Sequence, residues 1–131
     1  MDRRLYRRIT INAEGVFILD NNEISHREFP GVIEDISEGG IKIKMVKDEA
    51  NHILPHLKTG SYLHFLATDD YTLFGNVNST IISGQVEVLR QDTINDLITL
   101  GCKFKKYTSE LLDYVSDRKL SIYVDGLRGT T

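Results

Sequence analysis

Apolar and polar residues alternate with a period of two along much of the chain between residues 9 and 104, and this pattern sets the strongest limit on the fold. In the clearest example, Ile41, Ile43 and Met45 alternate with two lysines. Alternation of this kind is typical of strands that bury one face and expose the other. We expect six strands, at residues 9–19, 29–33, 41–45, 62–67, 81–89 and 98–104, the first of them broken or bulged near Gly15.

The segments between these strands are polar and rich in turn-forming residues. We expect a turn at 20–23, a polar loop at 69–78 that Leu73 and Phe74 interrupt, and a turn at 91–96. Residues 47–58 are less regular, and Pro55 makes a continuous helix there unfavourable.

The apolar spacing changes from strand-like to helical after Thr108, which is a suitable N-cap residue. Leu111, Leu112 and Val115 follow at helical intervals, so we expect a helix at about 108–120. Residues 120–124 fit either the end of this helix or a short strand, and we expect 126–131 to be a tail.

Six strands followed by one helix indicate an all-β domain, because no alternation of strands and helices predicts a parallel sheet. A small antiparallel barrel is the simplest architecture, since closing the sheet removes its exposed edges. We expect the C-terminal helix to cover one opening of this barrel. The length of 131 residues fits one domain.

Charge is distributed unevenly along the chain. Residues 1–8 carry four arginines and one aspartate, a net charge of +3, and the rest of the chain carries −6. A cationic arm on an acidic body suits a small anion and argues against a nucleic-acid partner. The single cysteine, Cys102, fits a packed core thiol and a reducing cytoplasm, and neither a signal peptide nor a membrane segment is expected.

Two short motifs are the strongest candidates for function. Residues 35–40 read Asp-Ile-Ser-Glu-Gly-Gly between two expected strands, so they predict a turn that offers the polar side chains of Asp35 and Ser37. Glycines at positions 39 and 40 permit positive φ and close approach of another group to the backbone. Upstream, Arg4 and Arg8 form an Arg-x-x-x-Arg pair, about one hairpin's length before this turn.

This pair of motifs resembles the pattern of the PilZ domain, the bacterial receptor family for cyclic di-GMP. The family combines Arg-x-x-x-Arg, a spacer of one hairpin, and then Asp/Asn-x-Ser-x-x-Gly. Gly84-x-Val86 and Leu100-Gly101-x-x-Phe104 match later features of the same pattern. The resemblance covers roughly residues 3–120 and implies a six-stranded antiparallel barrel with a C-terminal helix.

The resemblance also implies a set of residues that bind cyclic di-GMP. They are Arg3, Arg4, Arg8, Asp35, Ser37, Gly39 and Gly40. Arginine pairs with phosphate oxygens or with the O6 and N7 edge of guanine, and it stacks on purines. Asp35 is the expected acceptor for guanine N–H groups, and Ser37 adds a donor or an acceptor.

The register of the arginine pair has two solutions, because Arg3 with Arg7 fits the same spacing. We prefer Arg4 with Arg8, since Arg8 directly precedes the first strand as the family pattern requires. Arg7 departs from the pattern, which more often has an apolar or aromatic residue there. An arginine at the place of Arg3 tends to accompany an intercalated ligand dimer in this family. Arg90 is a further cation whose part in binding the sequence leaves open.

Three other functions are weaker alternatives. A PilZ-like domain that binds protein partners without ligand is the second hypothesis, although none of the expected residues is missing. A nucleic-acid-binding barrel lacks a stripe of lysines and aromatic residues. An enzyme lacks a nucleophile–base pair, and His52 and His56 lack a third metal ligand. We therefore expect a cytoplasmic effector that binds cyclic di-GMP, changes the conformation of its arm, and signals to a protein partner.

Overall fold

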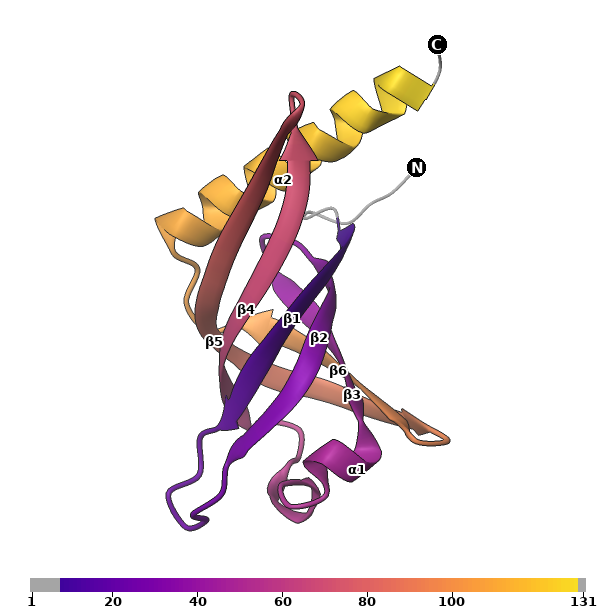
Figure 1. Cartoon of the computed structure of the whole chain (residues 1–131). Coiled ribbons are helices and arrows are strands. Elements are labelled where there is room, and N and C mark those ends of the chain that lie inside the picture. The colour runs from indigo at the N-terminus through magenta and orange to yellow at the C-terminus, as the bar shows by residue number, and fades with distance from the viewer. Residues whose placement is uncertain (1–7, 130–131) are drawn as a thin grey trace.

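The computed structural model describes residues 8–129, which form a closed six-stranded antiparallel barrel with short helices at one end and a long helix at the other (Figure 1). The elements are β1 (Ile9–Leu19), β2 (Glu28–Ile36), β3 (Gly40–Val46), α1 (Lys47–Ala50), the 3-10 helix η1 (Leu54–His56), β4 (Tyr62–Leu73), β5 (Asn76–Ile94), β6 (Leu97–Phe104) and α2 (Ser109–Gly129). The strand order is β1-β2-β3-β6-β5-β4, and β4 pairs back onto β1. The predicted all-β class, strand number and C-terminal helix are confirmed.

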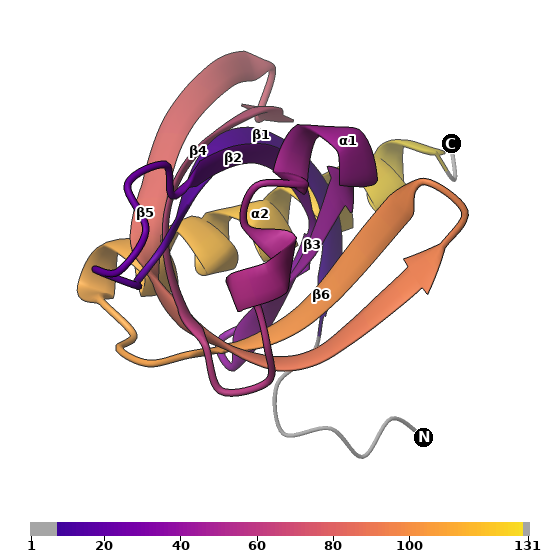
Figure 2. The same cartoon turned by 90° about the horizontal axis from the view of Figure 1, so that it is seen from below.

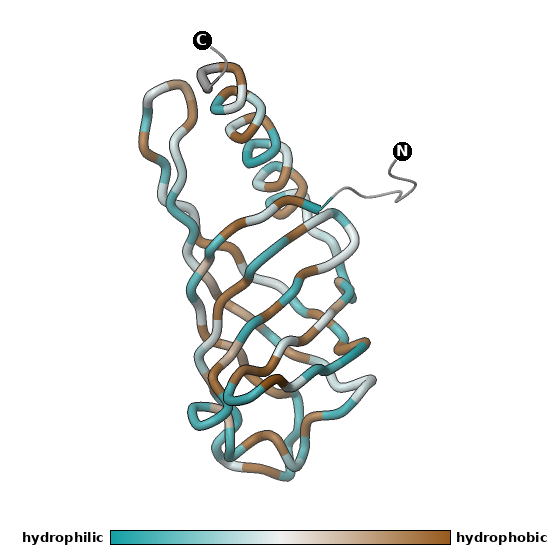
Figure 3. The backbone as a smooth tube through the Cα atoms, turned by 90° about the vertical axis from the view of Figure 1, so that its right-hand side faces the viewer, coloured by the Kyte–Doolittle hydropathy of each residue, from teal (hydrophilic) through white to brown (hydrophobic). Residues whose placement is uncertain are grey.

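The core of the barrel follows directly from the alternation in the sequence, which is visible as alternating colours along the strands in Figure 3. On β3, Ile41, Ile43 and Met45 point inward while the lysines between them are partly exposed. Phe17 and Phe29 stack in the interior with ring centroids 5.6 Å apart. One apolar face per strand is therefore enough to fill a barrel of this size.

Helices close the two openings of the barrel, as the view from below shows (Figure 2). Leu111, Tyr114 and Val115 of α2 are buried at one end. Gly84 lies under this end of the barrel, where an added Cβ would crowd the Phe65 ring at 3.1 Å and touch Leu111 Cδ1 at 3.4 Å. At the other end, the segment with α1 and η1 buries Ala50, Ile53 and Leu57, a closure that the sequence did not predict.

Two expected loops are instead parts of long hairpins. The polar loop predicted at 69–78 is wrong, since β4 and β5 stay paired up to Leu73 and Asn76. Phe74 and Gly75 have φ of 53° and 80°, the mirror-image turn that joins two twisted strands. The turn predicted at 91–96 is likewise shorter, because β5 continues to Ile94. Polar composition alone does not end a strand that stays hydrogen-bonded to its partner in the hairpin.

The first strand is continuous through Gly15, so the break predicted there is wrong. Gly15 lies between Gly31 of β2 and Ala67 of β4, and a Cβ at this position would lie 2.4 Å from the Leu66 carbonyl oxygen. The glycine is needed because of this close approach. The irregularity of β1 occurs earlier, between Thr10 and Ala13.

The C-terminal helix begins as predicted and ends later than predicted. Thr108 caps it, with its hydroxyl oxygen accepting a hydrogen bond from the Leu111 backbone N–H at 3.2 Å. The helix continues to Gly129, so the end expected near residue 120 is wrong. The tail expected at 126–131 is also wrong for residues 126–129, which are helical. Ser121 is buried on this helix, and its hydroxyl donates a hydrogen bond to the Arg118 carbonyl oxygen one turn earlier. No helix among the described residues has the length and hydropathy that a membrane span requires.

Candidate functional site

The predicted site lies where β2 turns into β3, at the end of the barrel that α2 covers (Figure 1). Ile33 and Ile36 both point into the core, and the pairing of β2 with β3 shifts register between Ile33 and Asp35. The extra residue that this shift accommodates leaves Glu34 and Asp35 partly exposed on the outside. The bulge therefore presents the Asp35 carboxylate at the outer surface of the barrel.

Arg8 and Asp35 are brought together as the sequence predicted. The Arg8 Nη1 atom donates a hydrogen bond to Asp35 Oδ1 at 2.9 Å. Their side chains are 33% and 21% exposed, so the pair is open to a ligand from one side. Arg8 is placed by β1, which begins at Ile9 and pairs with β2. Arg3 and Arg4 lie outside the described residues.

Ser37 is buried inside the turn rather than pointing into solvent. It is 4% exposed, and its hydroxyl oxygen accepts a hydrogen bond from the Gly39 N–H at 3.1 Å. Its own N–H donates to the Gly40 carbonyl oxygen at 3.0 Å. This double contact holds the turn in one shape, which gives Ser37 a positioning role in the structure.

Gly39 and Gly40 tie the turn to β6. The Gly39 carbonyl accepts a hydrogen bond from the Phe104 N–H at 3.0 Å. A Cβ at Gly40 would lie 2.0 Å from the Cys102 carbonyl oxygen, so no other residue fits there without moving a strand. Gly40 is not among the described residues with positive φ, and its requirement is close packing alone.

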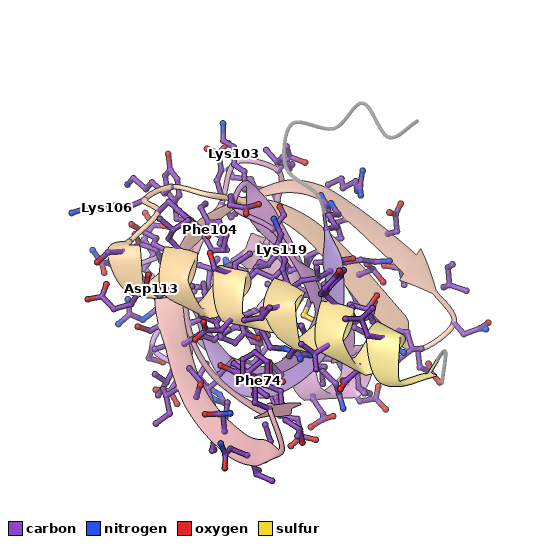
Figure 4. The ribbon with its side chains drawn as sticks, turned by 90° about the horizontal axis from the view of Figure 1, so that it is seen from above. Phe74, Lys103, Phe104, Lys106, Asp113 and Lys119 are labelled. Atoms are coloured by element: carbon purple, nitrogen blue, oxygen red, sulfur yellow. The ribbon has the colours of Figure 1, made fainter. Side chains whose placement is uncertain are left out.

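Glu38 and Lys119 connect this turn to the C-terminal helix, a contact that the sequence did not predict. Lys119 Nζ donates to Glu38 Oε1 at 2.6 Å, across 81 residues of sequence. Figure 4 shows Lys119 on the side of α2 where β6 ends at Phe104, opposite the side on which Phe74 lies. The turn between β2 and β3 is therefore in direct contact with α2.

The environment of Glu38 shifts two pKa values. Burial opposes ionisation of Glu38, but the hydrogen bonds from Lys119 and from the Glu38 backbone, together with the Lys119 charge, lower its pKa below 4.5. Burial, reinforced by the Glu38 charge, raises the pKa of Tyr107 to about 12. Glu38 Oε2 and the Tyr107 hydroxyl have no hydrogen-bond partner among the described residues.

Replacing Lys119 with methionine is expected to lower the free energy of unfolding by about 0.5–1 kcal/mol at neutral pH, since the pair is partly exposed. Because the pKa of folded Glu38 is depressed, this stabilisation is present above the pKa of the unfolded chain and is lost as the pH falls through the folded pKa. Urea unfolding at neutral pH and well below pH 4.5 measures both effects. Lys106→Met, at an exposed position, is the control, and a difference that persists in acid would contradict the assignment.

A groove of about 800 Å³ runs along the outer face of β1, β2 and β3 beside the Arg8–Asp35 pair. Thr10, Asp35 and Lys42 lie at the same level across these three strands, and the groove continues toward α1. A second hollow of about 750 Å³ lies between β1, β4 and α2. The site is thus an open surface groove and not an enclosed cavity.

The Cys102 thiol and the His26–His52 pair take no part in this site. Cys102 is buried, and burial raises the pKa of its thiol to about 12, as expected for a packed core residue. His52 stacks on His26 with centroids 4.0 Å apart and lies 2.5 Å from the Glu28 carbonyl oxygen. No cluster of three or more metal-ligating side chains occurs within residues 8–129.

Comparison with known proteins places this fold and turn in a family. The family model of the PilZ domain matches residues 2–117. The chain belongs to the PilZ domain family. Both motifs, the arginine pair and residues 35–40, lie within the matched PilZ range, as do the barrel and the first half of α2.

Two solved structures share the PilZ fold of this chain. The Bacillus subtilis inhibitor of motility (MotI/DgrA) is similar with a TM-score of 0.60 and 16% identity, over 92% of this chain and 53% of that chain. The chain thus spans about half the length of MotI. The PilZ domain of YcgR from Escherichia coli, solved with c-di-GMP, has a TM-score of 0.60 and 13% identity over 98% of both chains. No curated protein sequence matches the chain.

Proposed function

We propose that this PilZ domain is a non-enzymatic adaptor that binds cyclic di-GMP at the Arg8–Asp35 pair and changes the placement of its arginine-rich arm when it does so. The observation that carries the proposal is the 2.9 Å contact between a guanidinium and a carboxylate from two separate motifs, in an open groove. The similar PilZ domain of YcgR was solved with c-di-GMP, which supports this ligand.

The proposed roles follow from the chemistry of the ligand. Asp35 accepts hydrogen bonds from a guanine N1–H and amino group, and Arg8 moves to a phosphate or to the guanine O6 and N7 edge. Arg3 and Arg4 contribute further contacts from the arm, with Arg3 favouring an intercalated ligand dimer. Ser37, Gly39 and Gly40 keep the turn in the shape that accepts the base.

The Arg8–Asp35 contact also bears on the free-energy cost of binding. Ordering a free arm costs on the order of 1–2 kcal/mol per residue, which would offset much of the gain from a few contacts. Arg8 is already held by β1 and by Asp35 before ligand arrives. Ligand therefore exchanges one partner of Arg8 for another, and Arg8 itself adds little to the ordering cost.

Signalling to a protein partner is the second part of the proposal. The Glu38–Lys119 hydrogen bond joins the ligand-binding turn to α2, so a shift of the turn reaches the helix directly. A ligand changes such an equilibrium only by its difference in affinity for the two states. The partner surface would be the arm together with α2.

Arg8→Ala is expected to weaken binding of cyclic di-GMP by roughly 5- to 150-fold, the equivalent of one bidentate guanine or phosphate contact. Isothermal titration calorimetry on the wild type and the variant measures this and also gives the number of ligands bound. Arg27→Ala is the matched control, because it removes a partly exposed arginine that directly precedes β2, at the end of this strand away from Asp35.

Equal affinity of the wild type and Arg8→Ala would discard the role of the arm. A wild-type protein whose NMR spectrum shows no shifts on addition of cyclic di-GMP would favour the alternative, a ligand-independent protein-interaction domain. The Arg8–Asp35 pair would then be a structural ion pair.

A further inference from the structure

We infer that Arg90, lying across Gly101, provides a second anion contact of the site and binds the phosphate of cyclic di-GMP that is farther from Arg8. The inference rests on the proposed function. It extends the site from the arginine pair and residues 35–40 to β5 and β6, where the strand register pairs Arg90 with Gly101.

One row of residues crosses five neighbouring strands at the level of the site. Thr10 of β1 pairs with Asp35 of β2, and Asp35 pairs with Lys42 of β3. Lys42 pairs with Gly101 of β6, which in turn pairs with Arg90 of β5. Gly101 faces outward, because its neighbours Leu100 and Cys102 are both in the core.

The Arg90 side chain lies flat over the bare backbone of Gly101. A Cβ at Gly101 would be 2.7 Å from Arg90 Nε and 2.9 Å from its Cγ, so only glycine leaves room for the side chain in this position. Gly101 is itself buried by this contact, although it faces outward. The fold thus directs an arginine back along the row toward the site.

The spacing suits one half of a cyclic dinucleotide. Neighbouring strands lie about 4.8 Å apart, so Gly101 and the guanidinium above it are about 10 Å from Asp35. A guanosine phosphate spans a comparable distance from its base edge to its phosphate. A guanine held by Asp35 therefore places a phosphate near Arg90, with the Lys42 ammonium between them.

The second phosphate of the ligand could lie either toward Arg90 or along the groove on β1, β2 and β3, and the distribution of charge favours Arg90. The groove is lined by four carboxylates, Glu14, Glu34, Asp35 and Glu49, and by only two lysines, both of which lie within 4 Å of Glu34. Beyond the Arg8–Asp35 pair, the groove therefore offers the second phosphate no lysine that is free of a carboxylate. Arg90 is exposed and belongs to none of the ion pairs among residues 8–129, so its charge is available to an anion.

Arg90→Ala is expected to weaken cyclic di-GMP binding by roughly ten- to a hundredfold in calorimetry, the range for losing a hydrogen bond to a charged group. Arg90→Lys should retain part of the affinity, since a phosphate accepts a point charge. Gly101→Ala should weaken binding similarly, because its Cβ displaces the Arg90 guanidinium.

A double-variant cycle separates this role from a general effect of charge or folding. In the Arg90→Ala background, Gly101→Ala should weaken binding no further, because the side chain that it displaces is already absent. Thermal unfolding of each variant verifies that the fold is kept, and Arg27→Ala serves as the charge control. Additive losses, or equal losses for Arg90→Ala and Arg27→Ala, would overturn the inference.

The same titrations distinguish the two proposals. Wild-type affinity in Arg90→Ala, together with weakened binding in Arg8→Ala, would remove Arg90 from the site and leave the proposed function intact. No binding of cyclic di-GMP by the wild-type protein would overturn both.

Discussion

Asp69→Ala is expected to lower the free energy of unfolding by about 3 kcal/mol, because it leaves the Arg118 side chain, which is only 13% exposed, without its counter-charge. Asp69 lies on β4 and is only 2% exposed. Its Oδ2 atom is 2.8 Å from Arg118 Nε and accepts a hydrogen bond of 2.5 Å from the Tyr114 hydroxyl. Both partners come from α2, so this carboxylate is the main polar anchor of the helix on the barrel.

Arg118 makes two further contacts besides the ion pair with Asp69. Its guanidinium lies 4.9 Å from the centre of the Tyr71 ring, and Nη1 donates to the Ser121 hydroxyl at 2.9 Å. Burial, together with the hydrogen bond to Asp69, raises the pKa of Tyr114, so its hydroxyl remains a donor at all ordinary pH values. Loss of Asp69 would therefore leave a charge and a donor unsatisfied together.

Urea unfolding measures this effect, with Asp70→Ala as the control at the adjacent, exposed position. The double variant Asp69→Leu with Arg118→Met should be more stable than Asp69→Ala, since apolar residues of similar size replace the ion pair without leaving a charge. An Asp69→Ala variant within about 0.5 kcal/mol of the Asp70→Ala control would show that the pair contributes little.

The sequence predicts those parts of the fold that depend on local pattern. Strand alternation places the core of β3, and Thr108 marks the start of α2. The contact between Arg8 and Asp35 follows from one hairpin of correct length between two motifs. Each of these features is set by residues close in sequence or by a register that one hairpin fixes.

The features that the sequence did not predict depend on contacts between distant segments. Glu38 meets Lys119 across 81 residues, and no periodicity points to that pair. The burial of Asp69 could have been predicted from the sequence, because the inward-facing positions Leu63, Phe65 and Ala67 continue in steps of two to Asp69. Tyr114 and Arg118 also share a helical face with the predicted core residues of α2, so a buried polar cluster could have been predicted.

Gly40→Ala is expected to lower the free energy of unfolding by about 3 kcal/mol and to weaken ligand binding with it. The added Cβ would lie 2.0 Å from the Cys102 carbonyl oxygen and 3.0 Å from the Lys103 Cα. Both are backbone atoms in a paired strand, so β3 or β6 must move. That movement breaks the hydrogen bond from Phe104 to Gly39 and displaces the turn that carries Ser37.

Gly126→Ala is the matched control for this substitution, because a Cβ at that position of α2 meets no atom within 4 Å. Alanine should stabilise the helix there by about 0.5–1 kcal/mol, so the two glycine variants should differ in sign. Urea unfolding and calorimetry with cyclic di-GMP on both variants test stability and binding separately. If Gly40→Ala were as stable as the wild type and bound ligand normally, the close packing of the turn on β6 would not be the reason for glycine at this position.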